Sequence, residues 1–162
     1  MIRPATHADA PAITRIINQV ITETTITVTS VTKSEADVTA MLTERRALGH
    51  EVFVAAKADL ILGYATYAQF RPSPGYLRTM EHSLALTDAA QGRGLGRALL
   101  QAVESHAQAA GAHVMIAAIT ADNLKSIGFH TRLGYAQAGL LPQVGYKFGR
   151  YHDLVLMQKI LT

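Results

Sequence analysis

A glycine-rich segment in the middle of the chain is the part best suited to bind a ligand. It reads Gln91-Gly92-Arg93-Gly94-Leu95-Gly96-Arg97 and follows an alternating run that is typical of a strand. Closely spaced glycines let backbone N–H groups converge on an anion, and the N-terminus of a following helix adds partial positive charge. The segment therefore predicts a pyrophosphate site, with Arg93 and Arg97 able to pair with phosphate oxygens. The alternatives are a plain glycine-rich turn and two solvated arginines.

Two widespread phosphate-binding motifs do not match this segment. A P-loop needs Lys-Ser or Lys-Thr after its last glycine, and a dinucleotide fingerprint needs a glycine where Arg97 stands. The spacing therefore indicates neither a P-loop nucleotide site nor an NAD-type site.

Composition limits the remaining chemistry. The chain has no cysteine, which excludes disulfides, thiolate metal sites and a cysteine nucleophile. Its seven histidines show no compact spacing with carboxylates, so we expect no metal site. The net charge of +3 suits an anionic cofactor as well as nucleic acid, but the basic residues are dispersed rather than clustered with aromatic ones. We therefore expect no nucleic acid partner.

The elements around the glycine-rich segment predict one α/β domain over residues 1–162. That length, with 49% apolar residues, suits one compact core. No apolar window is long enough to span a membrane and no signal peptide precedes the domain, so we expect a cytoplasmic protein without membrane contact. Periodicity, capping residues and glycines predict helices over 7–21, 34–48, 95–110 and 123–133, and strands over 52–56, 61–67, 79–87, 114–119 and the region up to 157.

The strand over 79–87 determines which side chains share a face. Alternation places Glu81 and Ser83 on one face and His82 and Leu84 on the other. For this reason we interpret His82 as a structural residue rather than a partner of Glu81.

The spacing of Gln91, Gly94 and Gly96 resembles the acyl-CoA signature Gln/Arg-x-x-Gly-x-Gly/Ala of the GNAT N-acetyltransferases. More segments, spread over almost the whole chain, closely resemble the phosphinothricin acetyltransferase subgroup. They are Phe70-Arg71-Pro72-x-Pro74-Gly75-Tyr76, Glu81-His82-Ser83, Gln91-Gly92-Arg93-Gly94, His113-Val114-Met115, Asn123-x-x-Ser126-Ile127 and Lys147-Phe148-Gly149-Arg150.

The resemblance implies a fold, an activity and an assembly. The fold would be the GNAT fold, an α/β (α+β) arrangement whose central mixed, mostly antiparallel sheet has helices on both faces. The activity would be direct transfer of an acetyl group from acetyl-CoA to the amino group of a small amino-acid-like molecule, such as phosphinothricin or methionine sulfoximine, in a ternary complex. The family is often dimeric, so we expect a homodimer.

The resemblance also implies where acetyl-CoA binds. The strand before the glycine loop would offer backbone groups to the pantetheine and pyrophosphate, the loop would hold the phosphates, and the head of the next helix would hydrogen-bond the cofactor. The expected cofactor-binding residues are Leu84, Ala85, Leu86, Gln91, Gly92, Arg93, Gly94, Leu95, Gly96, Arg97, Asn123 and Ser126.

Acetyl transfer needs a neutral amine, a stabilised oxyanion and a protonated thiol. Glu81 resembles the family's catalytic glutamate and would accept the ammonium proton, while N–H groups near Leu84 would polarise the acetyl carbonyl. His130 stands where many family members have a tyrosine, and an imidazolium there could protonate the CoA sulfur. Tyr135 and solvent stay open as alternative proton donors. Glu81 could instead be a solvated or salt-bridged carboxylate, and His130 a structural residue.

The acceptor side departs from the family pattern. An aromatic residue followed by an acid usually comes after the Thr-rich turn, whereas the nearest alignment here gives Val28 and Thr29. Arg71, Arg78 and Lys147 are candidates to bind a substrate carboxylate or phosphinate, with surface roles as the alternative. A polyamine, an antibiotic or a protein N-terminus stays open as the acceptor, and so does a non-catalytic acyl-CoA-binding regulator.

Overall fold

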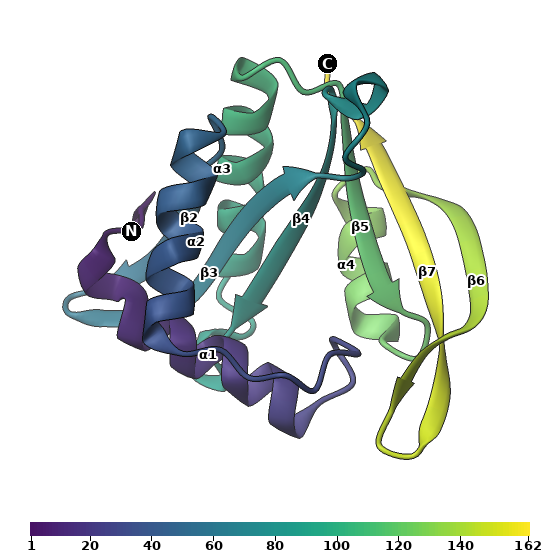
Figure 1. Cartoon of the computed structure of the whole chain (residues 1–162), viewed down its shortest axis with the longest axis horizontal. Helices are drawn as coiled ribbons and strands as arrows, with labels where there is room; N and C mark the ends of the chain where they lie inside the picture. Colours follow the sequence, from purple (N-terminus) through teal and green to yellow (C-terminus); the bar gives the residue numbers. More distant parts are fainter.

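A seven-stranded sheet with strand order β1-β2-β3-β4-β5-β7-β6 forms the centre of the molecule in a computed structural model that describes residues 1–162 (Figure 1). All neighbouring strands pair antiparallel except β4 and β5, which are parallel. The strands are β1 (Ile2–Pro4), β2 (Val52–Lys57), β3 (Leu60–Gln69), β4 (Thr79–Leu86), β5 (Val114–Thr120), β6 (Ala136–Lys147) and β7 (Arg150–Ile160).

Helices cover both faces of this sheet. They are α1 (Ala10–Glu23), α2 (Glu35–Ala47), α3 (Leu95–Ala109) and α4 (Leu124–Arg132), with short 3-10 turns at His7–Asp9, Pro74–Tyr76 and Asp88–Ala90. The predicted mixed, mostly antiparallel sheet with flanking helices is thus confirmed. None of these helices is both long and apolar enough to cross a membrane.

The helix starts follow from the capping residues. Ser34 Oγ accepts a hydrogen bond from the backbone N–H of Asp37, and Asn123 Oδ1 accepts one from the N–H of Ser126. Each bond satisfies a backbone donor that has no partner inside its helix. The predicted first helix differs slightly, because residues 7–9 form a 3-10 turn before α1 begins at Ala10.

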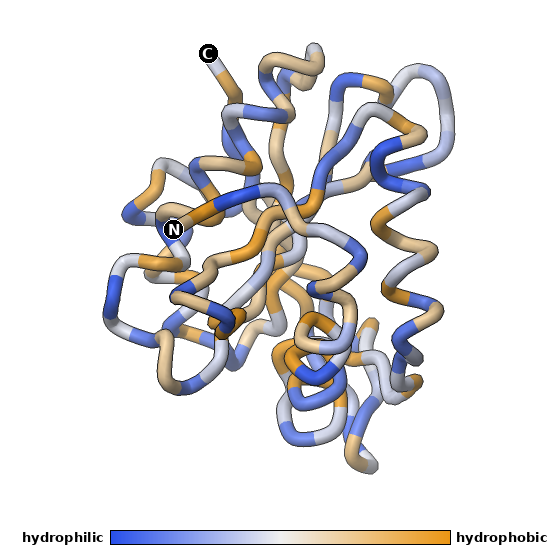
Figure 2. The backbone as a smooth tube through the Cα atoms, turned by 90° about the vertical axis from the view of Figure 1, so that its left-hand side faces the viewer, coloured by the Kyte–Doolittle hydropathy of each residue, from blue (hydrophilic) through white to orange (hydrophobic).

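The sheet separates two hydrophobic cores. One lies under α3 and α4 and includes Leu99, Val103 and Met115, and the other lies under α1 and α2 and includes Ile13 and Leu42. Figure 2 shows hydrophobic segments running through the middle of the molecule and an alternation of hydrophobic and polar residues along the helical coils.

The pairing of β4 with β5 ends halfway along β4. Thr79 to Glu81 pair with Val114 to Ile116, and beyond Glu81 strand β4 pairs only with β3. Strand β5 meanwhile pairs with β7 along its whole length. The two strands therefore diverge after Glu81, as Figure 1 shows, and the backbone edge of β4 from Ser83 to Leu86 has no partner strand on the β5 side.

Candidate active site

A cavity of about 550 Å³ lies at the point where β4 and β5 diverge. Its lining includes Ile17 and Val20 of α1 on one face of the sheet and Ser126 and Phe129 of α4 on the other. Because α1 and α4 cover opposite faces, the cavity connects the two sides of the sheet. A ligand on one side can therefore reach a ligand on the other without crossing a hydrogen-bonded pair of strands.

Glu81 lines this cavity and is the last β4 residue that pairs with β5. Its carboxylate makes neither a hydrogen bond nor a salt bridge with another side chain. Burial raises the pKa of Glu81 above the ordinary value for a glutamate. The salt-bridged alternative is thus absent from the structure, and the carboxylate can accept a proton from a ligand in the cavity.

His82 and His130 form a direct pair at the α4 side of the cavity. Their Nε2 atoms are 3.1 Å apart and the rings stack at 14°. His130 Nδ1 lies 2.8 Å from the Ser126 carbonyl oxygen, which can only accept, so Nδ1 carries the proton and Nε2 is free to accept from His82. No third His, Asp or Glu joins the pair in a group that could hold a metal ion.

This pair is held in the neutral state. Burial, reinforced by the charge of His130, lowers the pKa of His82 to about 3, and burial also lowers the pKa of His130. In the neutral tautomers that these contacts require, each N–H already has a partner, while the buried Nδ1 of His82 has none. In its resting form His130 is thus a neutral imidazole whose one N–H proton, on Nδ1, is directed at the Ser126 carbonyl, and its role as proton donor to the CoA sulfur stays a prediction. His82 is not isolated from the site, since its ring contacts His130.

Tyr135, the other side chain considered as a proton donor, points elsewhere. Its hydroxyl donates to Glu104 Oε1 at 2.8 Å, and Lys159 Nζ donates to the other carboxylate oxygen at 2.8 Å. The Tyr135 ring packs edge-on against His82 and His130 but is absent from the cavity lining. The hydroxyl is thus committed to Glu104.

The glycine-rich segment forms the turn into α3. Gly92 and Gly94 have φ of 74° and 73°, a left-handed conformation that side chains other than glycine disfavour. A Cβ at Gly96 would lie 3.4 Å from Leu86 and 3.5 Å from Phe129, so a small residue lets α3 approach β4 closely. The expected cofactor residues therefore form one path, from Leu84 on the cavity wall to the N-terminus of α3.

The other expected cofactor residues lie around this path. Arg93 and Arg97 are exposed at the start of α3 and form no salt bridge. Asn123 and Ser126 line the cavity, with Asn123 also capping α4. Lys125, which the sequence did not single out, donates from Nζ to Gln91 Oε1 and so links α4 to the glycine loop.

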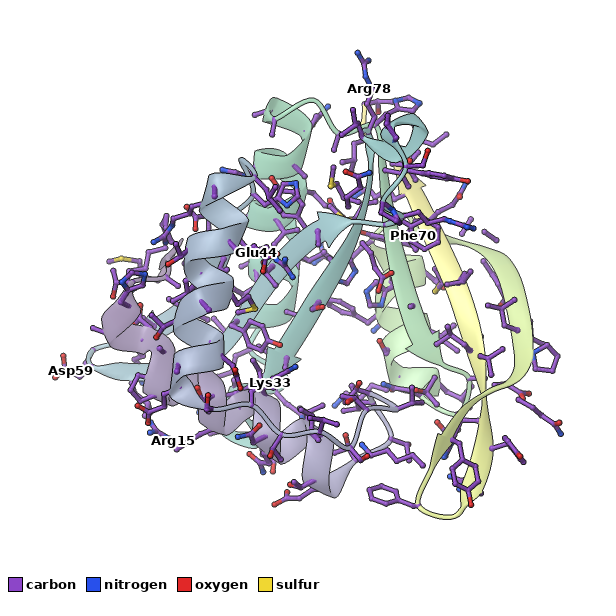
Figure 3. All side chains as sticks on the ribbon, viewed as in Figure 1. Arg15, Lys33, Glu44, Asp59, Phe70 and Arg78 are labelled. Atoms are coloured by element: carbon purple, nitrogen blue, oxygen red, sulfur yellow. The ribbon has the colours of Figure 1, made fainter.

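The three expected substrate-binding cations are outside the cavity lining. Arg71 stacks over Tyr76, with its guanidinium carbon 5.5 Å from the ring centre. Arg78 extends outward at the end of the molecule opposite α1 (Figure 3). Lys147 is buried and donates from Nζ to the carbonyl oxygens of Thr24 and Thr27 at 2.7 and 2.8 Å. Within one chain, then, none of the three side chains lines the cavity that contains Glu81, and their role in acceptor binding stays a prediction.

The Thr-rich segment between α1 and α2 forms the cavity wall that the sequence did not predict. Residues 26–29 line the cavity, and Val28 packs so closely against β6 that a Cβ at Gly145 would lie 2.6 Å from it. Thr120 Oγ1 donates to the Thr25 carbonyl oxygen at 2.6 Å. The threonine spacing alone gave no sign of these long-range contacts.

Comparisons with known proteins agree with this architecture. The sequence profile of the acetyltransferase (GNAT) domain matches residues 2–156. An L-methionine sulfoximine/L-methionine sulfone acetyltransferase of Pseudomonas aeruginosa is 44% identical over 97% of this chain and 92% of its own length. A phosphinothricin N-acetyltransferase of Alcaligenes faecalis is 33% identical over 99% of this chain and 82% of its own length. The structure of yncA from Salmonella typhimurium, solved with its cofactor acetyl-CoA, superposes with a TM-score of 0.97 at 38% identity and covers 100% of this chain and 94% of that one.

Proposed function

The chain belongs to the GNAT family of acetyltransferases, as the resemblance of its motifs predicted, and we propose that it acetylates the α-amine of a small amino acid of the methionine sulfoximine or phosphinothricin kind. It is an N-acetyltransferase, and acetyl-CoA is the proposed donor. The observation that carries this proposal is the cavity between β4 and β5, which opens on both faces of the sheet and contains the unpaired carboxylate of Glu81.

The residues along β4 and α3 suit an acyl-CoA. The unpaired backbone edge from Ser83 to Leu86 can hydrogen-bond an extended pantetheine, much as a neighbouring strand would. The N–H groups of the glycine loop and the N-terminus of α3 suit a pyrophosphate. Arg93 and Arg97 are exposed beside them and can pair with further phosphate oxygens. The acetyl-CoA thioester supplies the activated acyl group, and the backbone N–H near Leu84 polarises its carbonyl.

Glu81 prepares the acceptor for attack. Its carboxylate takes a proton from the incoming ammonium, directly or through a water molecule, which leaves a neutral amine beside the thioester. Burial raises the pKa of Glu81, which makes its carboxylate a stronger base for the ammonium proton. Removal of the carboxylate should therefore slow catalysis without removing donor binding.

His130, on α4, is the proposed proton donor to the CoA sulfur as it leaves. Glu81 has already taken one proton from the acceptor ammonium. As a neutral imidazole, His130 accepts the second proton, which the acceptor nitrogen releases after it attacks the thioester, and then passes it to the CoA thiolate. The lowered pKa of His130 favours the second transfer, because a buried imidazolium gives up its proton readily. This role requires the hydrogen bond between His130 and His82 to open during turnover.

The composition of the cavity supports a small amino acid over a polyamine. Among the lining residues Glu81 is the one carboxylate, and the remaining wall is mostly apolar or hydroxyl-bearing. A polyamine site would need several acidic groups to match its repeated positive charges.

A homodimer is the proposed assembly, in the cytoplasm where acetyl-CoA is available. The hairpin of β6 and β7 exposes a run of large apolar side chains that water alone covers in a single chain. Exposed apolar side chains gathered on one hairpin favour an interaction surface there. They include Leu140, Leu141, Val144, Tyr146, Phe148 and Tyr151.

The test is thiol release from acetyl-CoA with a panel of amino acids and polyamines, run beside Glu81→Gln. Turnover of methionine sulfoximine or phosphinothricin that collapses in the variant would support the proposal. Acetyl-CoA binding without turnover of any amine would contradict it and favour the non-catalytic regulator, and turnover of polyamines alone would move the acceptor to that class.

A further inference from the structure

Lys33 is the one lysine or arginine among the residues that line the cavity. It stands at the end of the Thr-rich segment, directly before the capping residue Ser34 of α2. In Figure 3 it lies near α1, at the opposite end of the molecule from Arg78. The cavity thus carries one carboxylate, Glu81, and one ammonium, Lys33.

The backbone of Lys33 is held in place from α1. Asn18 Nδ2 donates to the Lys33 carbonyl oxygen at 2.8 Å, and the Lys33 N–H donates to Asn18 Oδ1 at 2.8 Å. A side chain that starts from a fixed backbone loses less freedom when it binds a ligand. The position is therefore built into the fold even though the lysine side chain itself is exposed.

The ammonium of Lys33 is available to a ligand. It forms no salt bridge with any carboxylate of the chain. Asp37 is the carboxylate nearest in charge interaction to Lys33, and it already accepts a hydrogen bond from the Ser34 N–H at 2.8 Å. No competing group within the chain therefore has to be displaced before Lys33 can bind an anion.

We propose that Lys33 binds the carboxylate or phosphinate of the acceptor and thereby selects zwitterionic amino acids over simple amines. This proposal rests on the proposed acetyl transfer and deepens it. An amino acid places its ammonium toward Glu81 and its anionic group toward Lys33, so the two charges of the cavity match the two charges of the substrate. Lys33 is then a specificity-determining residue and takes no part in proton transfer.

The test compares methionine sulfoximine with its α-carboxamide, which keeps the amine and loses the negative charge. Lys33→Gln should raise KM for the amino acid about 10- to 100-fold, as expected for loss of a hydrogen bond between charged groups, and should leave kcat and KM for the carboxamide within about twofold. Lys33→Arg should restore most of the preference. Lys57→Gln, which removes an exposed lysine outside the cavity, serves as the matched control.

Equal KM values for wild type and Lys33→Gln with the amino acid would overturn the proposal. If the wild type turned over no amino acid at all, the proposed function would fail separately. The role of Lys33 would then be decided by calorimetric titration of methionine sulfoximine into the CoA-loaded protein, where equal affinity of the wild type and Lys33→Gln would overturn it.

Discussion

Glu81 combines burial with the absence of any partner, and both properties have measurable consequences. An ionised carboxylate that loses water without gaining a hydrogen bond costs free energy, and this cost appears as the raised pKa. A group whose pKa is raised on folding favours the native state below its unfolded pKa and loses that contribution as pH rises through the folded pKa. At neutral pH the charge of Glu81 therefore destabilises the fold.

We predict that Glu81→Gln lowers kcat by about a hundredfold or more and raises the melting temperature at pH 7 by about 2 °C. In the wild type, kcat/KM should fall as pH decreases through a pKa above the ordinary glutamate value, since the base must be ionised. Stopped assays over a pH series and thermal melts check both parts. A variant that lost activity and stability together would argue for a structural role of Glu81.

His82 and His130 give the protein a pH dependence of the opposite sign. Because folding lowers the pKa of both histidines, the unfolded chain binds more protons at acidic pH. The stability that the neutral pair contributes is complete above the unfolded value of 6.5 and is lost as pH falls from there toward about 3. The charged and titratable surroundings of the pair are Glu104, Glu81 and Tyr135.

We predict that His82→Asn flattens the loss of unfolding free energy between pH 7 and pH 4.5, because it removes the histidine with the larger pKa shift. Urea unfolding at both pH values measures this, with His113→Asn as a control at an exposed histidine. An unchanged slope in His82→Asn would contradict the lowered pKa of His82 as the cause of this pH dependence.

The same variant tests whether His82 positions His130. With methionine sulfoximine as acceptor, kcat of His82→Asn should fall about tenfold, while KM for acetyl-CoA stays constant.

At the scale of elements, Lys147 joins the α1–α2 segment to β6. Its ammonium donates to the carbonyl oxygens of Thr24 and Thr27, in the segment that forms one wall of the cavity. We predict that Lys147→Met lowers the unfolding free energy by about 1–3 kcal/mol, because two partly buried carbonyls lose a charged donor. The acceptor KM should rise at least several-fold while KM for acetyl-CoA changes little.

Denaturant unfolding and initial rates measure the effect of Lys147→Met, with Lys57→Met as the control. If KM for acetyl-CoA rose as much as the acceptor KM, the segment would not belong to the acceptor side alone. A normal acceptor KM in a destabilised variant would show that Lys147 supports the fold without shaping the pocket.

At the scale of the whole molecule, the sequence revealed local features and missed the long-range ones. Helix caps such as Ser34, the left-handed glycines before α3 and the alternation of β4 depend on neighbours in the chain, so their patterns predict the elements, whereas the cofactor-binding residues stay a prediction. The contacts of Lys147 with Thr24, and of His130 with His82, join residues 123 and 48 positions apart, respectively. Residue type and spacing do not encode such contacts, which is why the sequence offers Lys147 as a candidate for substrate binding and gives no sign of its hydrogen bonds to Thr24 and Thr27.

The early end of the β4–β5 pairing also has a kinetic consequence. If donor and acceptor occupy opposite faces of the sheet, neither covers the route by which the other leaves. Initial-velocity plots should then give intersecting rather than parallel lines, and CoA should inhibit competitively against acetyl-CoA but not against the amine. Parallel lines would indicate an acetylated enzyme intermediate. The chain has no cysteine to carry the acetyl group, and the cavity opens on both faces of the sheet, so the amine can attack the thioester directly. The divergence of β4 and β5 would thus allow each product to leave the enzyme independently of the other.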